Sequence, residues 1–380
     1  MSTVAVRPRV AMVGDGQLAQ MTQQAAISLA VELRVLGEDP DAPAVRAGAE
    51  HVPGRCDDPA ALRRVAEGCA VLSFDHEGAT PELLATLEAE GVRLAPGARA
   101  KALAQDKVLA RRELDALGLP VPPWALAHST SQVSAFGLTH GWPLVAKLPR
   151  GGYDGRGVWE LSDAAAAEAL LDAHPGGLLL EPRLELVCEI AVLIARSATG
   201  ELAGYPVVET VQRDGMCREM RVPAAVPSAR ADEAGALARE LAERIGLVGL
   251  MAVELFLTQG GLLVNELALR PHNSGHWTIE GCETSQFEQH LRAVLGWPLG
   301  ATGLCAPAVA CANVVGPEDG SDPRDRLPAA LAVPGAHVHL YGKAARPGRK
   351  LGHVTVCGED PDLVRASALR AVALLHGEEA

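Results

Sequence analysis

Two glutamates in adjacent apolar segments could bind a metal ion. Glu254 lies within residues 249–257 and Glu266 within residues 261–267. The three residues between these segments, Thr258-Gln259-Gly260, predict a β-hairpin that places the two glutamates opposite each other on one face. Such carboxylates repel each other unless a cation lies between them, and Mg²⁺ binds through one or two carboxylates plus phosphate oxygens. The alternative, a pair of solvated glutamates, is opposed by the apolar neighbours, so the sequence predicts a magnesium site.

A glycine-rich loop beside a lysine indicates a nucleotide site. Lys147 ends a predicted strand, and residues 151–157 contain four glycines, with Arg150 and Arg156 in the same loop. Glycines make the loop mobile and expose its amides, so it could close over a triphosphate while Lys147 neutralises phosphate oxygens. The loop is not a Walker motif, because G-x-x-x-x-G-K-[ST] does not occur. A flexible hairpin without function would not need three cations, so we interpret the loop as phosphate-binding.

A second glycine motif, residues 14–19, follows a predicted strand and opens a predicted helix. It fits G-x-G-x-x-A, and the acidic residues Glu38 and Asp39 follow about 20 residues later, as in dinucleotide-binding folds. The physics is more general, because backbone amides at a helix N-terminus bind many anions. The motif therefore predicts phosphate binding, with NAD as one possibility and a plain tight turn as the alternative.

Polar residues follow another predicted strand at residues 73–77. Ligands of open α/β sheets bind at the carboxyl ends of strands. Asp75 and Glu77 fall on one side of this segment and could accept hydrogen bonds from an amine or a ribose hydroxyl. The alternative is that they cap the next helix.

The run from Arg270 to Thr278 is polar and directly follows the predicted metal strand. Arg270 could bind carbonate or phosphate through two hydrogen bonds. His272 and His276 have the H-x-x-x-H spacing of a zinc site, but Pro271 and Gly275 oppose the helix that such a site needs. Hydrogen bonding to substrate is the better interpretation.

A basic segment near the end of the chain, residues 341–353, contains four cations and no acid. In a chain with a net charge of −13 this predicts a phosphate clamp over the site, with an ordinary solvated charge run as the alternative.

The elements that must position these residues change character along the chain. The first hundred residues alternate strands and helices, which predicts a parallel sheet covered on both faces. One long helix is expected over residues 101–117, followed by an α+β region with strands at 144–148, 157–161, 178–181, 189–195 and 203–208. Short strands and a closing helix follow from residue 298. We expect three domains, at residues 1–97, 98–297 and 298–380.

Composition bounds the class of protein. The chain has 380 residues, of which 48% are hydrophobic and 21% charged, so it is not disordered. The acidic net charge argues against a general nucleic-acid binder. Eight cysteines without a C-x-x-C pair point to free thiols in a reducing compartment. No signal peptide or run of about 18 apolar residues is evident, so a cytoplasmic protein without a membrane partner is expected.

Taken together, these motifs resemble the N5-carboxyaminoimidazole ribonucleotide synthetases, which are ATP-grasp enzymes of purine biosynthesis. The resemblance spans nearly the whole chain and is most specific in residues 270–278 and in the pair Tyr341-Gly342-Lys343 and Gly348-Arg349-Lys350. It implies a Rossmann-like N-terminal domain, a central ATP-grasp domain and a small β-rich C-terminal domain. It also implies a homodimer.

The resemblance implies roles for individual residues. Glu254 and Glu266 match the Mg²⁺ ligands, and Arg270, His272 and Lys147 are the expected catalytic residues. The positions that match ATP contacts are Lys107, Lys147, Gly152, Tyr153, Asp154, Gly155, Arg156, Gly157, Val158, Glu181, Pro182, Arg183, Leu184, Glu189, Gln212, Asn265 and Glu266. The positions expected around aminoimidazole ribonucleotide are Gly16, Gln17, Leu18, Glu77, Tyr153, Arg156, Arg270, His272, Asn273, Lys343, Arg349 and Lys350.

The implied reaction uses ATP to convert bicarbonate to carboxyphosphate, which carboxylates the exocyclic amine of 5-aminoimidazole ribonucleotide. The product could be handed to a mutase. The alternatives are an ATP-grasp enzyme that acts on a different amine and, more remotely, a dinucleotide-binding oxidoreductase or regulator. Asp15 stands where the family usually has glycine, so its side chain is expected to turn away from the phosphate.

Overall fold

A parallel sheet forms the first part of the chain in the computed structural model, which describes residues 7–152 and 155–378. The strand order is β3-β2-β1-β4. Alternate residues of β1 enter different hydrophobic clusters, Val10 and Met12 with helices α1 and α2, and Ala11 and Val13 with α3 and α4. The prediction of a parallel sheet covered on both faces is confirmed. The elements are β1 (Arg9–Val13), α1 (Gln17–Ser28), β2 (Glu32–Gly37), α2 (Pro43–Arg46), β3 (Glu50–Pro53), α3 (Pro59–Ala66), β4 (Val71–Phe74) and α4 (Pro81–Ala89).

The helix expected over residues 101–117 is two helices, so that prediction is wrong. Helix α5 (Ala98–Gln105) ends at Asp106, whose backbone is extended, and α6 (Lys107–Ala116) begins directly after it. The Asp106 carboxylate accepts hydrogen bonds from the amides of Val108 and Leu109, both at 2.9 Å. The aspartate therefore caps a new helix, and Lys107 is the first residue of that helix.

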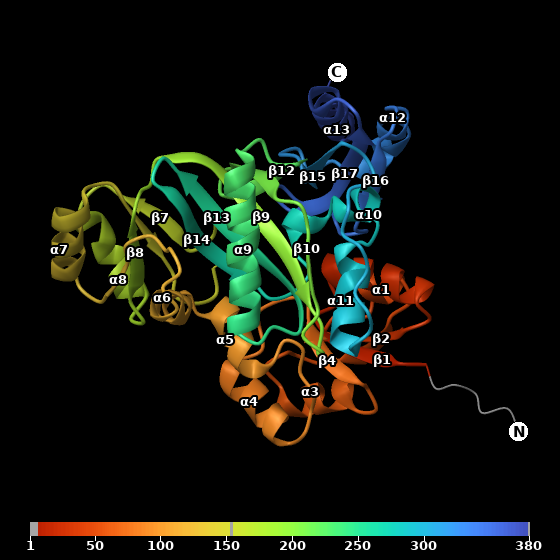
Figure 1. Cartoon of the computed structure of the whole chain (residues 1–380), viewed down its shortest axis with the longest axis horizontal. Helices are drawn as coiled ribbons and strands as arrows, with labels where there is room; N and C mark the ends of the chain where they lie inside the picture. Colours follow the sequence, from red (N-terminus) through yellow and green to blue (C-terminus); the bar gives the residue numbers. More distant parts are fainter. Residues whose placement is uncertain (1–6, 153–154, 379–380) are drawn as a thin grey trace, which may run out of the picture.

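A small antiparallel sheet with the order β5-β8-β6-β7 follows and carries the glycine-rich loop at one end. In Figure 1 it forms a separate lobe with α7 and α8. Its elements are β5 (Ala125–Ala127), α7 (Thr130–His140), β6 (Leu144–Lys147), β7 (Val158–Leu161), α8 (Glu168–Ala173) and β8 (Leu178–Pro182).

The large sheet runs through the rest of the molecule in the order β14-β13-β9-β11-β12-β15-β17-β16, with β10 paired to β9. The strand expected at residues 203–208 is instead two strands, β10 and β11, and β12 was not predicted. The C-terminal strands continue this sheet, because β15 pairs with β12. The strands are β9 (Leu186–Arg196), β10 (Leu202–Gly204), β11 (Val208–Arg213), β12 (Met216–Val222), β13 (Gly249–Thr258), β14 (Gly261–Ala268), β15 (Ala308–Val315), β16 (His337–Leu340) and β17 (Lys350–Gly358).

Two helices fix the large sheet to its surroundings. Helix α9 (Ser228–Arg244) packs along one face of β9 and β13, where Leu237 and Leu241 join the main core. Helix α11 (Gln286–Leu295) reaches the N-terminal sheet, where Leu291 packs with residues of β1 and α1 (Figure 1). Helix α11 thereby holds the N-terminal sheet against the large sheet. The remaining helices are α10 (Thr278–Gly281), α12 (Leu327–Leu331) and α13 (Pro361–His376).

A search of the described residues finds no helix with the length and apolar character that crossing a membrane requires.

Candidate active site

The hairpin β13–β14 brings Glu254 and Glu266 together as predicted. The two residues are direct partners in the strand pairing. Burial and the neighbouring carboxylates of Glu266 and Glu189 raise the pKa of Glu254 to about 8. Lys107 Nζ lies 2.6 Å from Glu266 Oε1. Two carboxylates held this close, one of them reluctant to ionise, form a donor set that fits Mg²⁺.

Lys147, at the end of β6, lies beside this hairpin. Its Nζ is 2.7 Å from Glu181 Oε2 and 3.0 Å from Asn265 Oδ1. Burial alone would raise the pKa of Glu181, but Lys147 and Arg111 hold it below its usual value. Arg111 donates from Nε to Glu181 at 2.7 Å and from its other end to the Asn265 carbonyl at 2.8 Å. The structure thus joins the two predicted halves of the nucleotide site through Arg111, which the sequence reasoning missed.

The glycine-rich loop approaches the turn between β11 and β12. A Cβ on Gly155 would lie 2.9 Å from the Gly215 Cα, so the two backbones could not come this close with a side chain there. Arg150 donates to Asp106 at 2.9 Å, which links the loop to the start of α6. Gly152, Gly157 and Val158 also lie in or next to this loop, and the predicted contacts Tyr153 and Asp154 lie outside the described residues.

The predicted adenine and ribose positions cluster near the end of β8. Glu181 and Pro182 end that strand, and Leu184 lies in the short connection to β9. Arg183 is directed elsewhere, since it forms an exposed ion pair with Glu160 at 3.3 Å. Burial raises the pKa of Glu189, which is hydrogen-bonded to Gln212. Glu189 lies on β9, the strand paired with β13, and its charge acts on Glu254.

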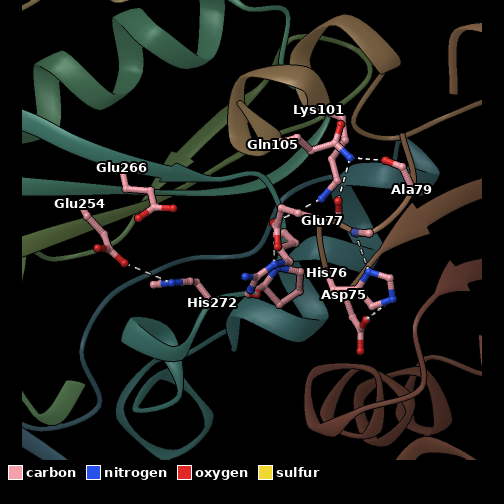
Figure 2. A network of polar contacts seen from close by, with 12 residues as sticks. Asp75, His76, Glu77, Ala79, Lys101, Gln105, Glu254, Glu266 and His272 are labelled. Carbon is pink, nitrogen blue, oxygen red and sulfur yellow. Dashed lines mark hydrogen bonds and ion pairs between the residues drawn. The ribbon is translucent and has the colours of Figure 1, made fainter. Parts of the chain in front are cut away.

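A second cluster lies next to the hairpin, around Glu77 and Arg270. Arg270 Nε donates to Glu77 Oε1 at 2.8 Å, and Lys101 Nζ is 3.4 Å from the same oxygen. These two cations hold the pKa of Glu77 well below its usual range, against the opposing effect of burial. Figure 2 shows His272 directed at Glu254, with Glu77 and Lys101 on its other side.

His272 connects the two clusters. Its Nε2 lies 3.2 Å from Glu254 Oε1, and its Nδ1 accepts a hydrogen bond from the Ser274 amide at 3.3 Å. Burial, aided by Arg270 and Lys350, lowers the pKa of His272 to about 3. The imidazole is therefore neutral at pH 7, with its Nε2 facing the Glu254 carboxyl group. The neighbouring Asn273 has a buried Oδ1 with no hydrogen-bond partner in the part of the chain that the structure describes, which leaves it available to a ligand.

His276, in contrast, lies in the core. It is 1% exposed and stacks on His353 at 4.8 Å between ring centroids and on Phe287 at 6.0 Å. Its position is set by packing between the polar run and the C-terminal strands.

The motif at residues 14–19 opens α1, with Gly16 as the N-cap residue. Asp15 turns toward β2, where a Cβ on Gly37 would lie 1.7 Å from Asp15 Oδ2. The Gly16 amide donates to Asp75 Oδ2 at 3.1 Å. A carboxylate thus takes the amide that the sequence assigned to phosphate. Of the other predicted residues, Gln17 contacts the basic segment, and Leu18 is buried in the core.

The basic segment docks onto the N-terminal part of the chain. Lys343 Nζ donates to Gln17 Oε1, and Arg46 donates to the Gly342 carbonyl at 2.8 Å. Arg349 donates to the Ala344 carbonyl at 3.1 Å, within its own segment. The positive charge of Lys350 acts on both Glu254 and His272. It opposes the effect of burial on the pKa of Glu254, and it adds to the effect of burial on the pKa of His272.

Comparison with known proteins gives the same picture of the chain's three parts. The ribonucleotide synthetase preATP-grasp domain matches residues 8–105, the ATP-grasp domain residues 112–287, and the phosphoribosylaminoimidazole carboxylase C-terminal domain residues 310–367. The N5-carboxyaminoimidazole ribonucleotide synthase of Mycobacterium tuberculosis is 49% identical over 98% of this chain and 89% of its own length. The chain belongs to the N5-carboxyaminoimidazole ribonucleotide synthase family.

Solved structures of this family have the same fold. The synthetase from Thermus thermophilus is 36% identical, with a TM-score of 0.87 over 97% of this chain and 99% of that one. The synthase from Aspergillus clavatus in complex with ADP and 5-aminoimidazole ribonucleotide is 30% identical, with a TM-score of 0.89 over 97% and 98% of the two chains. The predicted fold class, an ATP-grasp enzyme with a parallel N-terminal sheet and a C-terminal domain, is confirmed.

Proposed function

We propose that this chain is the ATP- and bicarbonate-dependent enzyme that carboxylates the exocyclic amine of 5-aminoimidazole ribonucleotide, in de novo purine biosynthesis. The observation that carries the proposal is the contact between His272 and Glu254 at 3.2 Å. This contact supports the proposal because the hairpin glutamates and the Arg270 cluster lie next to each other, as transfer between two substrates requires. A relative of the same fold binds ADP and this ribonucleotide.

The first step phosphorylates bicarbonate, which is a poor electrophile. A bicarbonate oxygen attacks the γ-phosphorus of ATP, the bond to the β-phosphate oxygen breaks, and ADP and carboxyphosphate form. Lys107, Lys147 and the amides of the glycine-rich loop stabilise charge on the transferring group, which is catalysis by position and electrostatics. Glu254 and Glu266 would hold Mg²⁺, which supplies further positive charge to the phosphate oxygens.

The second step transfers the carboxyl group. The amine nitrogen attacks the carboxyl carbon of carboxyphosphate, or of CO₂ released from it; the bond between that carbon and the phosphate oxygen breaks, and the departing phosphate takes the amine proton. The Arg270 guanidinium would bind the carboxyl group of carboxyphosphate. Neutral His272 would hold this carboxyl group in a fixed orientation next to the metal hairpin. Closure of the glycine-rich loop would exclude water, which otherwise hydrolyses the intermediate.

The ribonucleotide would lie between the Arg270 cluster and the basic segment. Glu77 and the Asn273 Oδ1 would accept hydrogen bonds from its amine and ribose hydroxyls, and the cations would bind its phosphate. The other residues that we assign to ribonucleotide binding are Tyr153, Arg156, Lys343, Arg349 and Lys350, with Gly16, Gln17 and Leu18 through their backbone. Binding at the Gly16 amide requires Asp75 to release it.

The same family membership suggests four further features. We propose domains at residues 1–97, 98–297 and 298–380, since β1 to β4, β5 to β14 and β15 to β17 fall within these ranges. We also propose a homodimer, which light scattering would test, and a cytoplasmic location. We also propose that the unstable product is transferred to a mutase, which would appear as faster consumption of that product when the mutase is added.

The deciding experiment measures ADP release from Mg·ATP with and without 5-aminoimidazole ribonucleotide and bicarbonate. Stimulation that needs both is expected. Release that is stimulated by bicarbonate and a different amine, but not by this ribonucleotide, would overturn the substrate assignment and favour an ATP-grasp enzyme with another acceptor.

A further inference from the structure

Lys101 is a charged side chain with no exposed surface, held beside the proposed ribonucleotide site. It lies on α5, and its Nζ is 3.4 Å from Glu77 Oε1 and 5.1 Å from the centre of the Phe74 ring. Four residues later on the same helix, Gln105 donates from Nε2 to the Glu77 carbonyl at 2.9 Å and to the Ala79 carbonyl. Residues four apart share one face of a helix, so one face of α5 grips both the side chain and the backbone of Glu77 (Figure 2).

Burial of this lysine is costly for the fold. An ammonium group loses its hydration inside a protein, and an apolar side chain of similar volume is often at least as stabilising as a buried ion pair. Burial does lower the pKa of Lys101, opposed chiefly by Glu77. A charge retained at such a cost indicates a functional role rather than a stabilising one. The ion-pair partner Glu77, beside the proposed ribonucleotide site, indicates what that role is.

We propose that Lys101 is a positioning residue that fixes the Glu77 carboxylate, and through it Arg270, for the carboxylation of the ribonucleotide amine; this rests on the function proposed above. Glu77 Oε1 is shared by Lys101 Nζ at 3.4 Å and Arg270 Nε at 2.8 Å. With Oε1 held at two points, the carboxylate cannot rotate freely, and Oε2 keeps one direction for a hydrogen bond from the substrate. The same arrangement aligns the guanidinium that holds the carbonate end.

The charge around this group explains what its removal would do. Besides each other, the ionisable groups that act on Glu77 and Lys101 are Asp75, His76 and Arg270. Lys101 in turn acts on His290, which lies on α11. Without Lys101, Glu77 would lose the larger of its two neighbouring cationic charges and keep Arg270, with a smaller effect of His76. The pKa of Glu77 would then rise, and activity that needs its ionised form would be lost at a higher pH than in the wild type.

A double-mutant cycle with Glu77 tests the proposal by kinetics. Lys101→Met, Glu77→Gln and the double variant are assayed for ADP release while the ribonucleotide and ATP are varied in turn. Lys101→Met is expected to raise the ribonucleotide KM about tenfold and to leave the ATP KM within about twofold. In the Glu77→Gln background the same change should have little further effect, because the oxygen it positions no longer carries charge. The acid limb of kcat/KM should move to higher pH in Lys101→Met, and Lys101→Arg should restore it in part.

Controls separate the outcomes. Arg365→Met removes one partner of the buried carboxylate Glu219, between β12 and α13, and should leave both KM values unchanged. An unchanged ribonucleotide KM, an equal effect in the Glu77→Gln background, or an unmoved pH profile would overturn the proposal for Lys101. If Lys101→Met fails to fold, Lys101→Gln replaces it in the same cycle. A wild-type enzyme that the ribonucleotide does not stimulate would instead overturn the proposed function.

Discussion

The two hairpin glutamates were the residues that sequence placed most firmly. A turn of fixed length sets the register of a hairpin, and register decides which side chains face each other. Glu254 and Glu266 are therefore paired in the structure as the spacing predicted. Burial of Glu254, together with the neighbouring carboxylates of Glu266 and Glu189, accounts for its raised pKa.

Glu266→Gln is expected to reduce Mg·ATP turnover by about a hundredfold or more, because one metal ligand loses its charge while keeping its shape. ADP release at saturating substrates measures the effect. Glu240→Gln, on the exposed face of α9, is the matched control and should retain activity. Near-normal turnover by a folded Glu266→Gln enzyme would contradict the metal assignment.

Buried charges are the residues that sequence did not reveal. Lys101 and Arg111 lie in helices whose pattern reads as ordinary and amphipathic, and a lysine or arginine in such a pattern is usually solvated. Their partners, Glu77 and Glu181, are 24 and 70 residues away. Each pair forms only in the folded chain, where Ala100 and Leu103 of α5 and Leu114 of α6 pack in the main core with the large sheet.

At the scale of elements, the break between α5 and α6 shapes the nucleotide site. The sequence over residues 101–117 looks like one helix because it contains no glycine or proline and Asp106 is one of several polar residues in it. Its carboxylate nevertheless caps α6, which puts Lys107 at the first turn and within reach of Glu266. A local hydrogen bond here overrides the periodicity.

Asp106→Ala should lower the free energy of unfolding by about 1 kcal/mol through loss of the cap, and should also raise the ATP KM because Lys107 is displaced. Denaturant titration and steady-state kinetics measure the two effects. Asp58→Ala removes the corresponding cap of α3 and should show the stability loss alone. An ATP KM that is equal in the two variants would refute the link between cap and site.

Strand β12 shows a different limit of sequence reasoning. Its residues include Arg218, Glu219 and Arg221, which do not look like the middle of a sheet. Glu219 is nonetheless buried, because Arg213, Arg221 and Arg365 surround it. Arg365 belongs to α13, so the burial of Glu219 within this strand cannot be predicted without the position of the C-terminal helix.

The basic segment makes its own prediction. Arg349→Ala and Lys350→Ala should each raise the ribonucleotide KM about tenfold or more, since each removes a charged hydrogen-bond donor to phosphate, and should change the ATP KM little. Arg230→Ala, in an exposed ion pair on α9, is the control. Equal weakening of both substrates would indicate that the segment closes the entire site instead.

At the scale of the whole molecule, the contact between the N-terminal and large sheets depends on a neutral histidine. His290 on α11 lies 2.8 Å from Ser73 Oγ on β4, and it accepts a hydrogen bond from the Leu250 amide on β13 at 3.2 Å. Burial, with a contribution from Lys101, lowers the pKa of His290 to about 3. The imidazole can therefore be protonated only with loss of this junction.

This lowered pKa predicts how stability depends on pH. The unfolded chain binds a proton at His290 near pH 6.5, whereas the folded chain does so only near pH 3. The contribution is thus complete above pH 6.5 and falls as the pH drops toward 3, by about 1.4 kcal/mol per pH unit for one group. Denaturant unfolding of the wild type and His290→Gln between pH 7 and 5 should show a shallower slope in the variant. The exposed His337→Gln should keep the wild-type slope, and parallel slopes for wild type and His290→Gln would contradict the assignment.

The continuous large sheet restricts how this enzyme can open and close. Strands β15 to β17 are joined to β12 by backbone hydrogen bonds, so the basic segment and the metal hairpin belong to one stiff body. Within the described residues, the small sheet shares no strand pairing with the large one, and residues 117–124 and 183–185 connect it to its neighbours. A change in the angle between this lobe and the large sheet would therefore have to take place at these two connections. Glu181 and Pro182 end β8 directly before the second connection, so we expect ATP binding at these residues to depend on that angle.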